Sequence, residues 1–253
     1  MAKEKYENFL DYGSSKIRVG VIDTENPQNK FFIDEGCQNS FKIKNLNFEA
    51  SDKKIHKVIK NLEKKLNYHL TDITLMIDSS DFVIIDVGLK KNFNNRLVKL
   101  NDIKNLLHEL NLLIKNNYPN FKILHFIITK INMDKKDLSS FPEENLNCNE
   151  LIFEAKFICL HNSIYNELIE KFKNKFISIK KIYCSSYVKS FFYNKSFQNY
   201  NYKFFIDIGF EKTSLVIYNK NKLNEIKYLP IGSNHITKDK LFQQQKTNCV
   251  FLY

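Results

Sequence analysis

The sequence predicts an α/β protein, in which short apolar strands alternate with amphipathic helices. Three observations support this class. Segments that alternate with a period of two, such as Ile17–Asp23, are interleaved with segments whose apolar residues recur every three or four positions. Hydrophobic residues make up 43% of the 253 positions, which is enough for a sizeable core. A strand–turn–strand pattern with Asp-x-Gly at its turn occurs near each end of the chain.

The first elements are expected to be three strands, a helix and a further strand. Their ranges are Glu7–Asp11, Ile17–Asp23, Phe31–Gly36, a helix from about Asp52, and Ile73–Ile77. Ser51 is the expected N-cap of the helix, because a serine hydroxyl can accept from the free N–H groups of the first turn. The sequence Asp78-Ser79-Ser80 is a turn signal at the end of the last strand.

The block from Asp81 to Leu160 is expected to form a unit of its own. Its elements are a strand at Phe82–Leu89, a helix capped by Asn101 and stopped by Pro119, and strands at Phe121–Ile131 and Leu151–Leu160. The polar segment Met133–Asn149, which contains Pro142, is predicted to be a loop.

The remaining elements alternate again. They are a helix near Asn162–Asn174, a strand near Phe176–Tyr183, a helix near Ser186–Tyr193, a linker at Gln198–Asn201, and strands at Lys203–Asp207, Thr213–Tyr218 and Leu223–Leu229. Two runs of aromatic residues are expected to belong to the core: Phe191-Phe192-Tyr193 and Phe204-Phe205. Cys159 and His161 have no second pair of ligands at metal-binding spacing and are expected to be structural.

The strongest signal is the repeat formed by Phe9–Val21 and Phe205–Ile217. Each copy is an apolar strand, Asp-x-Gly, a short polar turn and a second apolar strand. A glycine in the turn allows backbone N–H groups to approach a phosphate, and a strand-terminal aspartate can hold hydrated Mg²⁺. Asp-x-Gly also occurs as plain hairpin-turn chemistry, but two copies embedded between apolar strands favour phosphate binding.

Two such turns facing each other would clamp the β- and γ-phosphates of a nucleotide with a metal ion between them. The expected phosphate-binding residues come from both turns: Asp11, Gly13, Ser14, Ser15, Lys16, Asp207, Gly209, Lys212 and Thr213. Asp11 and Asp207 are also the expected Mg²⁺ ligands, acting through water. No residue is assigned a catalytic role.

These motifs resemble the actin-like ATPase superfamily and, more narrowly, the bacterial cell-division family FtsA. Asp11–Lys16 is similar to the first phosphate motif of the family, Asp207-Ile208-Gly209 to the start of the second, and Leu229–Asp239 to its "PIGGNHIT-D" segment. The resemblance covers about Asn8 to Leu241. It implies an actin-like (ribonuclease-H-like) fold with ATP and Mg²⁺ as cofactors, and a loop-ordering role for His235.

The resemblance also implies a division into subdomains. Residues 1–80 and 161–197 are expected to form subdomain IA, residues 81–160 an inserted FtsA-type (SHS2-like) subdomain IC, and residues 202–241 the start of subdomain IIA. Residues 242–253 resemble nothing in the family and are expected to be an aberrant tail. The second lobe is therefore expected to be incomplete, as in a truncated or frameshifted chain, with an unpaired edge and exposed apolar surface.

The function implied by the resemblance is a division scaffold. Such a protein links the FtsZ ring to the inner membrane, recruits other divisome proteins and self-associates. It is cytoplasmic and peripheral to the inner membrane. In this chain the FtsZ-binding part and the terminal membrane helix are expected to be missing. Phe210, Glu211 and Lys212 replace the glycines and first threonine of the family's second loop, D-I-G-G-G-T-T, which favours an ATP-binding scaffold with at most weak ATPase activity.

Three alternatives are weighed against this interpretation. An active actin-fold ATPase or phosphotransferase needs an intact second loop. A pilus-assembly relative of FtsA is distinguished mainly by Asn234–Thr237. A nucleic-acid-binding module rests only on the net charge of +11; since the basic residues are spread along the chain and only two of 39 are arginines, no nucleic-acid partner is expected. The five cysteines without a C-x-x-C, and an amino terminus without an apolar signal core, predict a reduced cytoplasmic protein.

Overall fold

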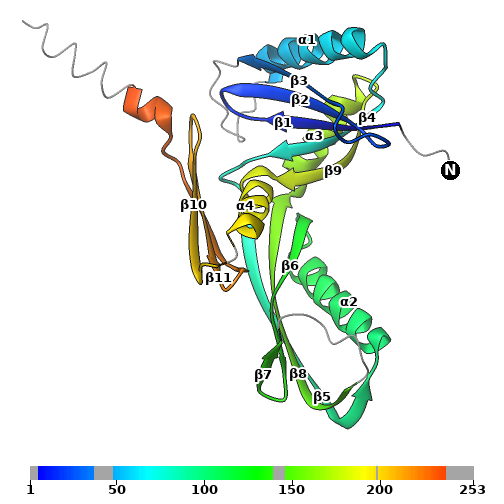
Figure 1. Cartoon of the computed structure of the whole chain (residues 1–253), viewed down its shortest axis with the longest axis vertical. Coiled ribbons are helices and arrows are strands. Elements are labelled where there is room, and N and C mark those ends of the chain that lie inside the picture. The colour runs from blue at the N-terminus through cyan, green and yellow to red at the C-terminus, as the bar shows by residue number, and fades with distance from the viewer. Residues whose placement is uncertain (1–4, 37–47, 139–145, 198, 238–253) are drawn as a thin grey trace, which may run out of the picture.

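The computed structural model describes residues 5–36, 48–138, 146–197 and 199–237, which form three separate sheets (Figure 1). The five-stranded sheet lies at one end of the molecule and the four-stranded sheet at the other. The three-stranded sheet stands to the side, with a helix between it and the rest. The class is therefore α/β with much antiparallel pairing, as the sequence predicts.

The five-stranded sheet has the strand order β3-β2-β1-β4-β9. Its strands are β1 (Tyr6–Tyr12), β2 (Lys16–Asp23), β3 (Lys30–Gly36), β4 (Asp72–Ile77) and β9 (Ser178–Cys184). The first three are antiparallel, whereas β4 and β9 run parallel to β1. The carboxyl ends of β1, β4 and β9 consequently meet at one edge of the sheet, where polar groups can gather.

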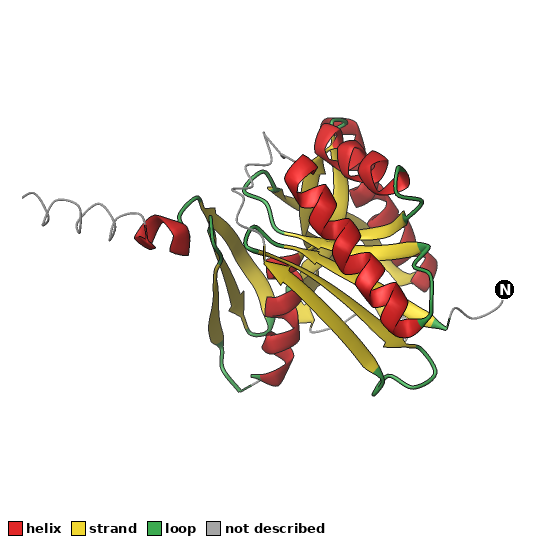
Figure 2. Ribbon diagram, turned by 90° about the horizontal axis from the view of Figure 1, so that it is seen from above, coloured by secondary structure: helices red, strands yellow, loops and turns green. Residues whose placement is uncertain are grey.

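One face of this sheet is covered by α1 (Phe48–Leu66), which packs on β2 and β3 and crosses the sheet in the view from above (Figure 2). The covered face alternates along each strand, so Leu10 of β1 and its partner Val19 of β2 are both fully buried. On the helix, Val58 and Leu62 face this surface from one side of the predicted apolar stripe. The strand periodicity and the helix periodicity therefore specify the same core.

The four-stranded sheet has a core of its own. Its elements are β5 (Val83–Val98), α2 (Leu100–Asn117), β6 (Phe121–Met133), β7 (Lys136–Leu138) and β8 (Leu146–His161), with the strand order β5-β8-β6-β7. Phe153 and Phe157 of β8 are buried against Leu106 and Leu110 of α2 in one cluster. This cluster is distinct from that of the first sheet.

The three-stranded sheet contains β10 (Tyr202–Ile208), β11 (Thr213–Asn219) and β12 (Lys222–Leu229). Helix α4 (Ser185–Ser196) packs on one face of it, whereas α3 (Asn162–Lys173) packs on β9 of the first sheet. Lys203 of β10 is buried and its ammonium donates to the backbone oxygen of Asn194 at 3.2 Å, near the carboxyl end of α4. A cation at this end of a helix is stabilised by the helix dipole, so Lys203 joins sheet and helix.

Several sequence predictions for element ends are wrong. Helix α1 begins at Phe48, so Ser51 lies inside it. Helix α2 begins at Leu100, so its N-cap is Lys99 and not Asn101. The Asp102 carboxylate accepts a hydrogen bond from the Lys99 N–H at 2.9 Å, which satisfies this backbone donor at the start of the helix.

The predicted loop Met133–Asn149 is in part a strand hairpin. β6 and β7 are joined at Asp134 and Lys135, both of which have positive φ, as a tight hairpin turn requires. The Asp134 carboxylate accepts from the N–H of Glu150 at 2.8 Å and ties this turn to β8. Residues 139–145, with Pro142, lie outside the described part of the chain.

The aromatic residues predicted for the core are mostly exposed. Phe192 is 67% exposed and Phe204 63% exposed, and only Phe205 among the five packs against the core. Phe204 shares the outer face of β10 with Ile206 and Ile208, which none of the described helices covers. The three-stranded sheet therefore carries the exposed apolar surface that the sequence predicts.

The two hairpins allow a matched test of this difference in burial. Leu10 and Ile206 occupy the same position of the repeat, but Leu10 is fully buried and Ile206 is 64% exposed. Leu10→Ala should lower the free energy of unfolding by about 2–5 kcal/mol because it opens a cavity. Ile206→Ala should change it by less than about 0.5 kcal/mol. Urea unfolding measures both, and equal losses would contradict the assigned burial.

Candidate functional site

The two Asp-x-Gly turns have the same geometry. The N–H of Gly13 donates to the carbonyl of Lys16 at 3.0 Å, and the N–H of Gly209 donates to the carbonyl of Lys212 at 2.9 Å. The pairing register is also the same, because each aspartate lies one pair further from the turn than the closing pair. The repeat seen in the sequence is thus a repeat in three dimensions.

Both turns need their glycine for space. A Cβ atom on Gly13 would lie 2.9 Å from the Lys16 carbonyl oxygen, and one on Gly209 would lie 2.9 Å from the Lys212 carbonyl oxygen. Neither oxygen belongs to a flexible side chain, so neither can move aside cheaply. A side chain at either position would therefore open the turn.

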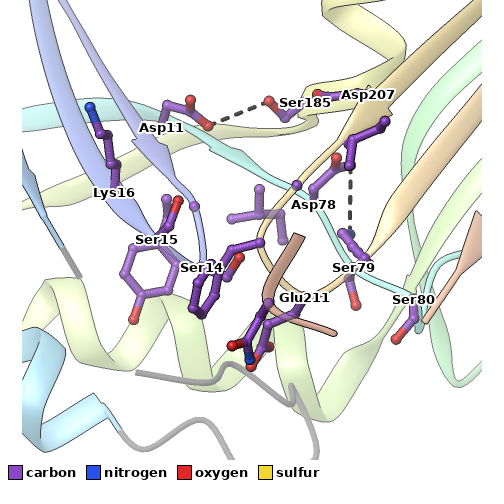
Figure 3. A pocket seen from close by; sticks show the side chains of 18 of the residues that line it. Asp11, Ser14, Ser15, Lys16, Asp78, Ser79, Ser80, Ser185, Asp207 and Glu211 are labelled. Atoms are coloured by element: carbon purple, nitrogen blue, oxygen red, sulfur yellow. Dashed lines mark hydrogen bonds and ion pairs between the residues drawn. The ribbon is translucent and has the colours of Figure 1, made fainter. Parts of the chain in front are cut away.

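The two turns line one cleft of about 790 Å³ (Figure 3). Eight of the nine predicted phosphate-binding residues lie on its wall: Asp11, Gly13, Ser14, Ser15, Lys16, Asp207, Gly209 and Lys212. Thr213 does not line it, because its hydroxyl turns away and donates to the carbonyl of Ile231 at 2.7 Å. The structure brings these residues together, while their predicted role as phosphate ligands stays a prediction.

The segment after β12 braces the second turn from behind. The N–H of Ser233 donates to the Gly209 carbonyl and that of Asn234 to the Phe210 carbonyl, both at 2.9 Å. His235 orders this segment, since its Nδ1 accepts from the N–H of Gly232 at 3.1 Å. A Cβ on Gly232 would lie 2.5 Å from the Gly209 oxygen, so the contact requires glycine.

The two aspartates predicted to hold Mg²⁺ already have cationic partners. Asp11 accepts from Arg18 Nη1 at 2.9 Å and from the Ser185 hydroxyl at 3.4 Å. Asp207 accepts from Lys189 Nζ at 3.0 Å. Burial by itself would lower the pKa of Lys189, but Asp11, Asp207 and Asp78 together hold that pKa above its ordinary value. Lys189 is therefore a firmly charged group between the carboxylates.

Within the described residues, no three His, Cys, Asp or Glu side chains gather as a ready-made set of metal ligands. Coordination through water leaves the Asp11–Arg18 pair intact and needs only the free acceptor capacity of each carboxylate. The predicted water-mediated role of Asp11 and Asp207 is compatible with this arrangement and stays a prediction.

Sequence reasoning missed Asp78, which follows β4 and also lines the cleft. Asp78 accepts from the hydroxyl of Ser186 at 2.9 Å and from its N–H at 3.3 Å. Burial raises the pKa of Asp78, although Lys212 nearby opposes the shift. A signal was present, because Asp78 follows the strand that runs parallel to β1 and so ends beside the first turn. The sequence Asp78-Ser79-Ser80 by itself indicates only a turn, and Asp78 is therefore not among the predicted site residues.

Lys212, in the second Asp-x-Gly turn of the three-stranded sheet, places a cation beside Asp78. Its ammonium is 3.9 Å from Asp78 Oδ1 and 5.0 Å from the centre of the Tyr228 ring. No hydrogen-bond acceptor for this ammonium exists among the described residues. The Tyr228 hydroxyl lies 3.0 Å from Cys184 Sγ. Burial lowers the pKa of Lys212, and Asp78 opposes the shift. The cluster thus joins the two sheets at the floor of the cleft.

The sequence matches no family model and no curated protein. The structure is similar to a chain of the PilM–PilN type IV pilus biogenesis complex, with a TM-score of 0.60 and 11% identity over 92% of this chain. The chain thus shares its mixed α/β fold with that chain of the PilM–PilN complex. It spans 63% of that PilM–PilN chain.

Two further solved structures match more weakly. The ethanolamine utilization protein EutJ from Carboxydothermus hydrogenoformans matches 96% of this chain with a TM-score of 0.48 and 9% identity, over 58% of its own length. A protein of unknown function with an actin-like ATPase fold from Bacteroides thetaiotaomicron matches 96% with a TM-score of 0.44 and 13% identity, over 77% of its length. The predicted FtsA family and its subdomain boundaries are finer than this likeness and stay predictions.

Membrane contact was predicted to be peripheral. Within the described part of the chain, none of the helices combines the length and the apolar character that a bilayer span needs.

The brace behind the second turn can be tested with a pair of glycines. Gly232→Ala should lower the free energy of unfolding by about 1–3 kcal/mol, because the new methyl group meets backbone oxygens that cannot move. Gly36→Ala is the control, since nothing lies within 4 Å of the added carbon. Urea unfolding of both variants compares them, and a Gly232 variant as stable as the Gly36 variant would argue against the brace.

Proposed function

We propose that this chain is the nucleotide-binding part of an actin-fold scaffold, and that its cleft binds the polyphosphate of ATP. One observation carries the proposal. Two Asp-x-Gly turns with the same hydrogen bond and the same crowded glycine line a single cleft. A single hairpin turn of this kind needs no ligand to explain it, but two matched turns around one hollow suit a ligand with several phosphates.

The residues of the cleft would contact different parts of the Mg·ATP complex according to their chemistry. The hydroxyls of Ser14 and Ser15 can donate to phosphate oxygens, and Lys16 and Lys212 can neutralise their charge. Mg²⁺, when bound with the nucleotide, would screen the charge of the β- and γ-phosphates, with Asp11 and Asp207 holding its water ligands. Each of these residues is on the cleft wall, although Lys16 would have to leave its ion pair with Asp34 to reach a ligand.

The same cleft favours binding over hydrolysis. Glu211 is on its wall, in a turn where the resembling family carries small residues, and a carboxylate there repels an approaching phosphate. The two carboxylates best placed to orient a water molecule, Asp11 and Asp207, are held by Arg18 and Lys189. A scaffold that binds ATP and hydrolyses it slowly, if at all, is the proposal that fits these groups.

Two scaffolding roles follow from different observations. Resemblance of the Asp11–Lys16 and Leu229–Asp239 segments to FtsA supports a cell-division scaffold with FtsZ, other divisome proteins and a second copy as partners. The likeness to the PilM–PilN complex supports a role in type IV pilus assembly instead. Binding of this chain to purified FtsZ and to purified PilN in parallel would separate the two roles. We propose the division role first, because it rests on motifs that line or brace the cleft.

ATP binding has a direct test in thermal stability. Millimolar Mg·ATP should raise the melting temperature of the folded chain, because a ligand of the native state stabilises it by mass action. Asp11→Asn and Gly209→Ala should each abolish most of this rise, the first by removing a cleft charge and the second by opening the turn.

Asp137→Asn is the matched control, since this carboxylate is on β7 and away from the cleft. It should keep the full rise in melting temperature. A folded wild-type chain whose melting temperature does not respond to Mg·ATP would refute the proposed function.

A further inference from the structure

The two turns differ in where their equivalent lysines point. Lys16 and Lys212 hold the same position in the repeat. Each lies three residues after the turn glycine, and its carbonyl accepts the hydrogen bond from that glycine's N–H. Lys16 points outward, pairs with Asp34 at 3.3 Å and has 51% of its side chain exposed. Lys212 points inward and has only 18% of its side chain exposed. The second turn therefore places a cation inside the molecule where the first places one at its surface.

The buried position of Lys212 leaves its ammonium without a hydrogen bond. Its nearest carboxylate oxygen, Asp78 Oδ1, is 3.9 Å away, which is beyond hydrogen-bonding distance. That same oxygen already accepts from the N–H and the hydroxyl of Ser186. Asp78 thus supplies Lys212 with opposite charge but not with an acceptor. A buried ammonium without a hydrogen-bond acceptor is stabilised by any oxygen that comes within hydrogen-bonding distance of it.

We propose that Asp78 competes with the phosphate ligand: it retains the Lys212 ammonium in the empty cleft, and the terminal phosphate of a bound polyphosphate takes its place. This inference rests on the proposed function and adds a residue that sets the affinity of the site. A phosphate oxygen gives Lys212 the charged hydrogen bond that Asp78 does not. The carboxylate of Asp78 then lies close to a second anion and weakens its binding.

Protonation of Asp78 removes the competitor. The groups that face Asp78 are Lys212 from the second turn, Lys189 and Ser186 from α4, Cys184 from β9 and Tyr228 from β12. Burial raises the pKa of Cys184 to about 11 and raises that of Tyr228 as well, so both stay neutral near pH 7.

The sign of the pH dependence follows from this setting. Since burial raises the pKa of Asp78, its carboxyl group takes up a proton at a higher pH than a free aspartate does. Ligand affinity of the wild-type chain should therefore rise as the pH falls through this folded-state pKa. The titration of the ligand's own phosphate affects wild type and variants alike.

The test measures affinity for ATP and for inorganic tripolyphosphate by calorimetry, with Mg²⁺, from about pH 5.5 to about pH 8. Asp78→Asn keeps the acceptor for Ser186 and removes the charge; it should bind about tenfold more tightly at neutral pH and lose the pH dependence seen in wild type. Lys212→Met should bind about tenfold more weakly. Asp137→Asn, which removes a carboxylate of β7 away from the cleft, should change affinity less than about threefold.

A double variant shows whether the two residues act together. If Asp78 acts mainly through Lys212, Asp78→Asn should raise affinity much less in the Lys212→Met background than in wild type. This double variant also removes both buried charges, so it stays folded even where Asp78→Asn alone lowers stability by leaving Lys212 unpaired. Circular dichroism verifies the fold of every variant at the temperature of the titration.

The outcomes separate this inference from the proposed function. Equal affinity of wild type and Asp78→Asn for ATP would overturn the inference and leave nucleotide binding in place. No binding by any folded variant would overturn both. Binding that is detectable only after Asp78→Asn would support competition by Asp78 and overturn nucleotide binding by the wild-type chain. A gain for tripolyphosphate as large as for ATP identifies the phosphate chain as the recognised group, whereas a gain for ATP alone identifies the nucleotide.

Discussion

The cleft depends on one buried polar contact between its two walls. Asp78 follows β4 of the five-stranded sheet, and Lys212 directly precedes β11 of the three-stranded sheet. The two charges lie 3.9 Å apart, with each side chain mostly shielded from solvent. Ser186 holds the carboxylate in place, and the Tyr228 ring lies against the ammonium. Removing one charge of such a pair leaves the other buried and costs more than an exposed pair would, so the relative position of the two sheets is fixed here.

Around this contact the chain uses one hairpin twice for different purposes. The backbones of the two hairpins agree in register and in the glycine hydrogen bond, because both features are local and follow from Asp-x-Gly between apolar strands. The surroundings do not agree. Leu10 is sealed beneath α1, while Ile206 at the same position faces solvent. Local sequence sets the turn, and tertiary packing decides what each face of the hairpin meets.

This division explains what the sequence could predict. Strands with a clear period of two, such as β2, and turns with Asp-x-Gly were predicted at nearly their observed places because the signal is local. The capping of α2 by Asp102 and the hairpin at Asp134-Lys135 were missed because polar residues permit several local structures. Asp78 and the exposure of Phe204 depend on elements far along the chain, which no local pattern specifies.

Strand β10 has a consequence for how the chain behaves in water. It forms one edge of the three-stranded sheet. All of its outward side chains are large and mainly apolar: Tyr202, Phe204, Ile206 and Ile208. The two charged residues of the strand point the other way, Lys203 toward Asn194 and Asp207 toward Lys189. Soluble proteins commonly guard such edges against strand-to-strand aggregation with an outward lysine or a proline, and β10 has neither. At high concentration or on heating, aggregation between molecules should therefore begin at strand β10.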